Sequence, residues 1–239
     1  MKVRSFDVDF KQRATLEMLC RCFVDAAWSH AEALGVGYTH LAQQNKVWVL
    51  SRLLVQVPTY PRWGETLTLN TWPRAAKSVF AMRDFEILSS AGQPVAGGTS
   101  AWLVLDASSR RPQRPEKILA LIRALPEKRA IDLEPQKLAA CAEASTQLPT
   151  TARYSDIDVN RHVTSAQYIA WLLDAYPLEF HRLHAVSLLE VNYVSEILGE
   201  EAVSVTTQQT LPGEFCHAIV KSDGTEACRA RLQWRTEGT

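Results

Sequence analysis

The sequence has little that would mark it for a nucleic acid, a metal or a membrane. Lysine plus arginine and aspartate plus glutamate both number 26, so the formal net charge is zero, whereas nucleic-acid-binding proteins are usually strongly basic. The cysteines have no paired spacing, which predicts neither a metal motif nor a disulfide framework and fits a reducing cytoplasm. The longest apolar run, WVLSRLLVQV, is too short and too interrupted to span a membrane.

Two further motifs are missing. The first residues, MKVRSFDVDFKQR, contain no apolar run of the length found in signal peptides, so we expect a cytoplasmic protein. There is no G-x-S-x-G motif, which disfavours a serine hydrolase of the α/β class. We expect no cofactor and no metal, because His40, His181 and His184 have no acidic or cysteine partners at ligand spacing.

What is present is the composition of an ordinary globular protein, with 239 residues, 46% apolar and 22% charged. FDVDF (6–10) alternates like a strand, and the apolar residues of 15–34 recur at helical spacing. Gly35 then gives a stop signal for that helix. The β-branched and aromatic runs that follow, separated by Gly and Pro at hairpin distances, predict an antiparallel sheet. They are VWVLSRLLVQV, TLTLNTW, VFAMRDFEIL and VAGGTSAWLVLD.

The second half repeats this order after a proline-rich segment. A short helix is expected over 115–124, and 126–150 reads as a linker. A helix is expected over 164–176, where Thr164 and Gln167 fit a capping box. The strand patterns VSLLEVNYVSEI, EEAVSVTTQQTL, EFCHAIVKS and EACRARLQWR follow that helix. We therefore predict an α+β fold built from an internally duplicated unit of one helix and one sheet.

Polar side chains are concentrated just before the second helix. In SDIDVNRHV, the residues Asp158, Asn160 and His162 stand at alternate positions. A helix N-terminus presents free N–H groups and partial positive charge, which can stabilise the oxyanion of an acyl-transfer reaction. The structural alternative is that Asp and Asn simply form a turn beside a surface histidine.

The same stretch resembles the signature of the acyl-acyl-carrier-protein thioesterases, D-x-D-x-N-x-H-V-N-N-x-x-Y-x-x-W. It matches from Asp156 to Trp171, and the similarity extends through WVLSRLLVQVPTYPRWGETLTLNTW, RDFEIL and TSAWLVLD. The resemblance implies a tandem hotdog fold, with an N-terminal hotdog over 1–125 that holds the acyl chain and a catalytic one over 151–239. The family's Y-x-x-E motif matches Tyr193 to Glu196, which makes Glu196 the last member of the implied site.

Two departures from the family pattern are visible. Thr164 and Ser165 replace the two asparagines of the signature. Ile197 stands where plant members have a cysteine after the glutamate, which excludes a nucleophilic cysteine at this position and favours attack by water. The resemblance therefore implies catalysis by Asp158, Asn160, His162 and Glu196.

The resemblance implies hydrolysis of a fatty acyl thioester on acyl carrier protein to a free fatty acid. Alternatives are an acyl-CoA thioesterase, a hotdog dehydratase of hydroxyacyl thioesters and a non-catalytic acyl-thioester sensor. Acyl carrier protein is the expected partner, with no nucleic acid and no membrane, and the chain is expected to be a monomeric pseudo-dimer or a homodimer. The basic run of Arg110, Arg111, Arg114 and Lys117 is either solvated surface or a contact for the acidic carrier.

The first half lacks the polar set, so we expect one active site per chain. Its contribution would be an apolar pocket for the hydrocarbon tail, and the alternative is that the same residues only pack the core. The expected pocket residues come from the apolar faces of the two helices. They are Leu16, Leu19, Phe23, Tyr168 and Trp171.

Overall fold

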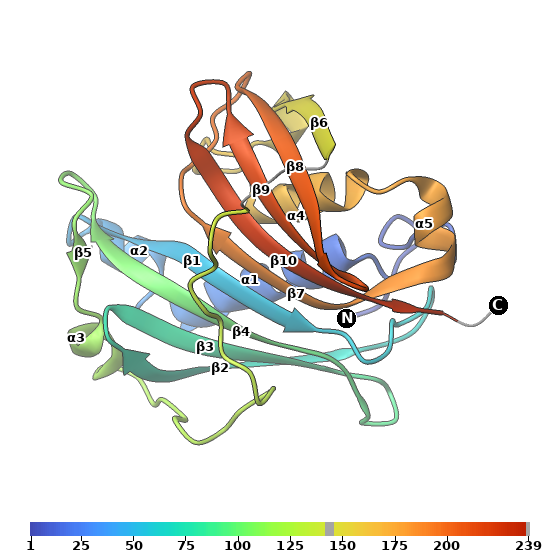
Figure 1. Ribbon diagram of the computed structural model, residues 1–239. Coiled ribbons are helices and arrows are strands. Elements are labelled where there is room, and N and C mark those ends of the chain that lie inside the picture. The colour runs from blue at the N-terminus through green and yellow to red at the C-terminus, as the bar shows by residue number, and fades with distance from the viewer. Residues whose placement is uncertain (142–145, 238–239) are drawn as a thin grey trace. The chain divides into compact units, whose positions relative to one another are not determined.

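The computed structural model describes residues 1–141 and 146–237. It divides into two compact units, Met1–Thr15 with Leu19–Pro135 and Leu16–Met18 with Gln136–Thr239. Each unit combines helices with an antiparallel sheet (Figure 1), which is the α+β organisation predicted from the sequence. The chain passes between the units at Pro135 and Gln136, inside the segment expected to be a linker.

The first unit contains most of the long helix predicted over 15–34. Helix α1 covers Leu16–Ala33. The sheet of this unit has the strand order β2-β3-β4-β1, with the short β5 paired to β4. Four of its strands overlap the four predicted runs. They are β1 (Lys46–Gln56), β2 (Thr68–Lys77), β3 (Phe80–Leu88) and β4 (Pro94–Asp106). The two-residue strand β5 (Pro112–Gln113) was not predicted.

Close packing of α1 against the sheet depends on an aromatic stack and a glycine. The ring of Phe23 stacks on that of Phe85, with centroids 4.8 Å apart, and both side chains are almost completely buried. A Cβ atom on Gly98 of β4 would lie 2.9 Å from the Phe23 ring. The absence of a side chain at Gly98 therefore lets the helix approach the strand, which explains a glycine inside strand β4.

Two local predictions for this unit were wrong. Residues 6–10 form no strand, because the Asp9 side chain accepts hydrogen bonds from the backbone N–H groups of Lys11 and Arg13 at 2.8 and 3.0 Å and turns the chain. The helix expected over 115–124 is only Glu116–Leu119 (α3). Beyond it the backbone bonds span three residues, as from Ile122 to Leu119, so the α-helix does not continue. A further short helix, α2, covers Tyr38–Ala42.

The second unit repeats the plan with a shorter main helix. Helix α4 (Ser165–Asp174) buries Tyr168, Ile169 and Trp171 on its inner face. The sheet order is β7-β10-β9-β8-β6. The remaining elements are η1 (Tyr154–Asp156), α5 (Leu178–Leu183), β6 (Thr146–Thr151), β7 (His184–Tyr193), β8 (Ala202–Leu211), β9 (Glu214–Lys221) and β10 (Glu226–Thr236).

Thr164 is the N-cap of α4, as predicted, but the expected capping box is not formed. The Thr164 side chain makes no capping hydrogen bond. Its backbone N–H instead donates to the carbonyl of Asp156 at 2.8 Å. The start of α4 is therefore tied to the preceding polar stretch by the backbone.

The connection into the second unit is held by polar side chains of its sheet. The backbone N–H of Leu138 donates to Asn192 at 2.8 Å, and Arg229 donates to the Leu138 carbonyl at 3.0 Å. Residues 146–150, which were expected to belong to the linker, pair with β8 as part of strand β6.

Cys141 and Cys216 form a disulfide with Cα atoms 6.0 Å apart, which corrects the expectation that the chain has none. Their separation of 75 residues explains why no spacing pattern revealed it.

Candidate active site

The predicted histidine and glutamate of the second unit are in direct contact. Nε2 of His162 lies 3.2 Å from a carboxylate oxygen of Glu196, and the two side chains are 30% and 40% exposed. His162 precedes α4, whereas Glu196 follows the end of β7 at Tyr193 rather than lying on the strand as the sequence suggested. The contact is therefore made by two loops and remains accessible to water.

A closed turn presents His162. Ile157 and Val163 form an isolated antiparallel bridge, and the backbone N–H of Asp158 donates to the His162 carbonyl at 2.9 Å. Inside the turn Arg161 has a φ of 66°, a left-handed conformation that non-glycine residues seldom adopt. These bonds fix the backbone from which the His162 side chain projects.

Asp158 and Asn160 form the second contact of the site. A carboxylate oxygen of Asp158 accepts a hydrogen bond from the Asn160 backbone at 2.8 Å, and the other accepts from the Asn160 amide group at 3.4 Å. This is the local Asp-to-backbone bond typical of turn-forming residues. The structure therefore shows two side-chain contacts among the four predicted residues, His162 with Glu196 and Asp158 with Asn160, and Asp158 orients Asn160.

Tyr168 holds the segment that carries Glu196. Its hydroxyl donates to the carbonyl of Ser195 at 3.3 Å and accepts from the backbone N–H of Ile197 at 3.1 Å. Burial raises the pKa of Tyr168, so the hydroxyl stays protonated and can do both. This contact was not predicted, because sequence reasoning assigns Tyr168 only to a substrate pocket. The Ile197 side chain is completely buried.

A carboxylate in contact with an imidazole can accept a proton from water and pass it on. The contact between Glu196 and His162 is the arrangement this chemistry needs, and its partial exposure admits the water. Within residues 1–141 and 146–237, no group of histidine, cysteine or carboxylate side chains is suited to holding a metal ion. No helix in the described part of the chain is long and apolar enough to cross a membrane.

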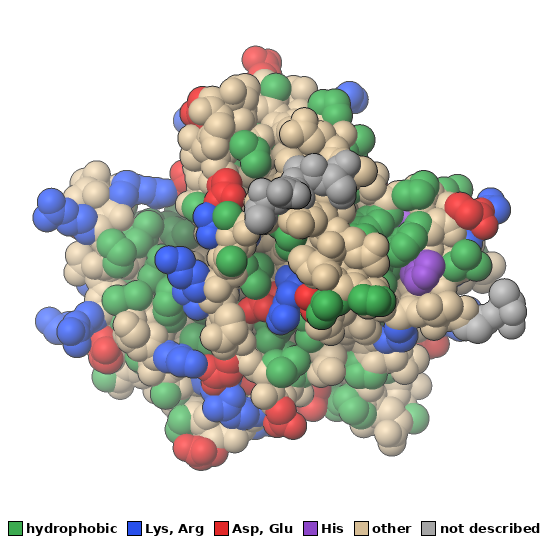
Figure 2. Space-filling model, in the orientation of Figure 1, with side chains coloured by type: hydrophobic (Ala, Val, Ile, Leu, Met, Phe, Trp, Pro, Cys, Tyr) green, Lys and Arg blue, Asp and Glu red, His purple; other side chains and the backbone are tan. Residues whose placement is uncertain are grey.

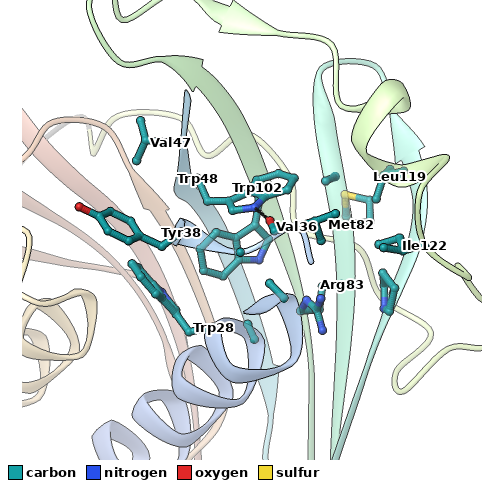
Figure 3. A pocket seen from close by; sticks show the side chains of 15 residues that line it. Trp28, Val36, Tyr38, Val47, Trp48, Met82, Arg83, Trp102, Leu119 and Ile122 are labelled. Atoms are coloured by element: carbon teal, nitrogen blue, oxygen red, sulfur yellow. Dashed lines mark hydrogen bonds between the residues drawn. The ribbon is translucent and has the colours of Figure 1, made fainter. Parts of the chain in front are cut away.

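The first unit contains an apolar cavity of about 50 Å³. One water needs about 10–15 Å³ in the same measure, so the space exceeds a single water molecule. Figure 3 shows Trp28 of α1 and Tyr38 of α2 on one side and Trp48 and Trp102 on the other. The indole N–H of Trp48 donates to the Val36 carbonyl at 2.8 Å, which fixes that ring.

This cavity is lined by residues other than the five expected from the sequence. Ala27, Trp28 and Ala31 of α1 reach it, one to two turns beyond Phe23. The five predicted side chains are buried in the cores of their units with at most 5% exposure. They are Leu16, Leu19, Phe23, Tyr168 and Trp171. Helical spacing identified a buried face of α1, but it could not show where along that face a cavity remains.

The basic run near β5 lies on the surface. Figure 2 shows lysine and arginine side chains at the left edge, where Figure 1 places β5 and the loop before it. All four side chains of the run are exposed. They are Arg110, Arg111, Arg114 and Lys117.

Two units that each pack a helix on an antiparallel sheet, with the polar site in the second, define a tandem hotdog protein. The family models agree with this class. Residues 1–122 match the acyl-ACP thioesterase N-terminal domain, and residues 140–236 match the acyl-ACP thioesterase C-terminal domain. The chain belongs to the acyl-ACP thioesterase family.

Individual relatives support the assignment. The chain is 29% identical to a chloroplastic palmitoyl-acyl carrier protein thioesterase of Gossypium hirsutum, over 98% of this chain and 62% of that protein. It is 25% identical to the chloroplastic oleoyl-acyl carrier protein thioesterase 2 of Arabidopsis thaliana, over 99% and 76%. The crystal structure of an acyl-ACP thioesterase from Bacteroides thetaiotaomicron is similar with a TM-score of 0.88 and 26% identity, over 98% of this chain and 96% of that one. The fold of the 12:0-ACP thioesterase from Umbellularia californica matches with a TM-score of 0.88 at 23% identity, over 99% and 96%.

Proposed function

We propose that the protein hydrolyses fatty acyl thioesters of acyl carrier protein and releases free fatty acids for lipid synthesis. The contact of 3.2 Å between His162 and Glu196 is the observation that carries the proposal, because it supplies a base in a chain of this family. The chain spans about 60% of the length of several plant relatives, such as the Gossypium protein at 62%. Their names indicate that they act on acyl carrier protein thioesters.

In the proposed reaction, Glu196 accepts a proton from water as the water oxygen attacks the thioester carbonyl carbon. The resulting tetrahedral intermediate collapses with cleavage of the carbon–sulfur bond. The thiolate leaves with the proton, which His162 can pass from Glu196 because the two side chains are in contact. The products are a fatty acid and the free thiol of the carrier.

The site residues also orient the reacting groups in this scheme. Asn160 and His162 position the water and the carbonyl, and donors aimed at the developing oxyanion lower the barrier. Asp158 holds Asn160 in its turn through the bonds of 2.8 and 3.4 Å. The first unit would bind the acyl tail in its apolar cavity. Each chain would have one active site, because the sequence of the first half contains no counterpart of the polar set.

An exposed basic surface is suited to contact with an acidic partner protein. We propose that an acidic acyl carrier protein contacts Arg110, Arg111, Arg114 and Lys117, which are all accessible. The named plant relatives are chloroplastic. The cytoplasmic location expected from the sequence stays a prediction, as does the choice between monomer and homodimer.

The test measures free fatty acid released from acyl carrier protein and acyl-CoA thioesters of the same chain length. We expect faster release from the carrier protein, and a reduction of about 10²–10³-fold in Glu196→Gln and in His162→Ala, because each removes a preorganised polar group. Glu200→Gln is the matched control, since Glu200 is an exposed carboxylate in the same segment.

Circular dichroism should be unchanged in all three variants. Equal or faster release from the CoA ester would reassign the carrier. Binding of the acyl thioester without any release would point to a sensor. Normal turnover in a folded Glu196→Gln variant would place the active site elsewhere.

A further inference from the structure

Among the residues that the structure describes, Arg83 is the only charged side chain that lines the cavity of the first unit. It lies on β3 and is only 8% exposed. Burial lowers the pKa of Arg83 to about 10, so the guanidinium is still protonated at neutral pH. Figure 3 shows Arg83 next to α1, among the aromatic and aliphatic side chains of the cavity. A cation is therefore held in an otherwise apolar space.

The guanidinium of Arg83 has polar contacts but no counter-charge. Its Nη1 lies 2.9 Å from Nδ1 of His30 and 3.1 Å from the hydroxyl of Thr71. The pKa of His30 is lowered by burial and by the charge of Arg83, so this imidazole is neutral and acts as an acceptor. Within residues 1–141 and 146–237, neither a carboxylate nor any partner for Nε or Nη2 is found.

Arg74, another deeply buried arginine of the same sheet, is paired with carboxylates. Arg74, which is 6% exposed, donates to Asp84 at 3.3 Å and to Glu134 at 2.8 Å. Asp84 follows Arg83 in the chain, but its carboxylate is used by Arg74 and by the backbone of Ala130. The sheet thus neutralises one buried arginine with two carboxylates and leaves the cavity arginine without any.

An unpaired buried cation is costly, and that cost is already part of the folded state. A ligand whose oxygen atom accepts a hydrogen bond from Arg83 inside the cavity would offset part of this free-energy cost. The edge formed by Nε and Nη2 has the geometry that binds a carboxylate through two parallel hydrogen bonds. A methyl group in the same place would gain apolar contact only with the surrounding rings.

We propose that Arg83 binds the far end of the acyl chain and that the preferred substrates carry an oxygen function there, with a carboxylate preferred over a hydroxyl and a hydroxyl over a methyl group. This inference rests on the proposed function only in placing the acyl tail in the first unit. The hydrolysis itself is unchanged. The substrate class becomes acyl thioesters whose chain is oxygenated at the end remote from sulfur.

Binding can be measured separately from hydrolysis. Three acyl pantetheine amides of one chain length, ending in methyl, hydroxyl or carboxylate, contain no thioester and differ only at the far end. Their dissociation constants follow from the quenching of tryptophan fluorescence, because Trp28, Trp48 and Trp102 line the cavity. We expect the carboxylate to bind about tenfold more tightly than the methyl compound, or better, with the hydroxyl between them.

Variants assign the effect to Arg83. Arg83→Met should abolish the preference for the carboxylate, and Arg83→Lys should retain only part of it, because lysine keeps the charge but not the planar fork. Arg123→Met, a change of an exposed arginine in the same unit, should leave the order intact. If Arg83→Met does not fold, the dissociation constants of the three amides for the wild type and for Arg83→Lys still test the inference.

Equal or tighter binding of the methyl compound by the wild type would overturn the inference, as would the absence of binding by all three amides. An unchanged carboxylate preference in Arg83→Met would do the same. If the protein hydrolyses a methyl-ended acyl carrier protein thioester but does not bind the carboxylate compound more tightly, this inference is wrong and the proposed function is retained. The preference without any hydrolysis would support this inference and reject the proposed function.

Discussion

The hydroxyl of Tyr168 accepts a hydrogen bond of 3.1 Å from the backbone N–H of Ile197. The same hydroxyl donates to the carbonyl of Ser195 at 3.3 Å. The residue between these two is Glu196, whose carboxylate contacts His162. A buried side chain of α4 therefore fixes the peptide groups on both sides of the proposed base.

Replacing Tyr168 by phenylalanine should loosen this segment without removing any group that meets the substrate. We expect kcat to fall about tenfold, since a loss of about 1.4 kcal/mol in positioning corresponds to that factor, while KM changes little. Stability should fall by about 1–3 kcal/mol, because the N–H of Ile197 loses its buried acceptor. Steady-state kinetics and urea unfolding measure the two effects.

Tyr176→Phe is the matched control for that experiment. Tyr176 is also a buried tyrosine of the second unit, and its hydroxyl contacts Nε2 of His217 at 2.8 Å rather than the segment of Glu196. This variant should lose stability and keep its kcat. An equal loss of kcat in both variants would show that the Tyr168 effect is only general destabilisation.

The elements were predictable where periodicity is strong. Helix α1 and the strands β1–β4 and β7–β10 follow apolar patterns that depend on neighbouring residues in the chain, whereas β5 and β6 do not and were not predicted. The contact between His162 and Glu196 was inferred from a family motif, because residues so far apart in sequence leave no local signal. The disulfide between Cys141 and Cys216 and the clamp by Tyr168 depend on tertiary packing alone, and the sequence showed neither.

Asp158→Ala should disturb the turn that presents His162. The alanine variant leaves the Asn160 backbone N–H without its acceptor at 2.8 Å. We expect kcat to fall about tenfold or more and stability to fall by about 1 kcal/mol.

Asp158→Asn separates hydrogen bonding from charge at the same position. Asparagine keeps an acceptor oxygen and also forms this kind of turn, so it should restore most of the stability and most of kcat. Restored stability with kcat still low would show that the negative charge of Asp158 takes part in catalysis, contrary to a purely orienting role.

Glu134 gives the first unit a contribution to stability that depends on pH. Hydrogen bonds from Lys77 and Arg74, in that order of importance, lower the pKa of its carboxyl from 4.5 to about 2. A carboxyl whose pKa is lower in the folded state stabilises the protein above the unfolded value. That contribution disappears as the pH falls from about 4.5 toward 2.

Glu134→Gln should therefore lower the free energy of unfolding at pH 7 by about 1–2 kcal/mol, a value reduced by the access of water to the carboxylate. The difference from the wild type should shrink as the pH falls below about 4.5. Urea unfolding at several pH values measures this, with Glu127→Gln, which changes an exposed carboxylate, as the control. A difference that does not vary with pH would mean that the ion pairs of Glu134 are not its source.

Cysteine should be needed for stability but not for turnover. The disulfide between Cys141 and Cys216 links residues 75 positions apart, and closing a loop of this length is worth about 4 kcal/mol in the chain-entropy model. The double Cys→Ser variant should lose stability of this order under oxidising conditions and should match the wild type once a reductant is present. Urea unfolding with and without reductant measures the difference.

Catalysis should survive the removal of every thiol. Cys20 and Cys228 are buried, and burial raises the pKa of Cys228, so it is not a source of thiolate. The position after Glu196 holds Ile197, which has no nucleophilic atom and is fully buried. A folded variant without cysteine should therefore hydrolyse acyl carrier protein thioesters at the wild-type rate. Loss of turnover in that folded variant, or an acyl-cysteine trapped in the wild type, would replace attack by water with covalent catalysis.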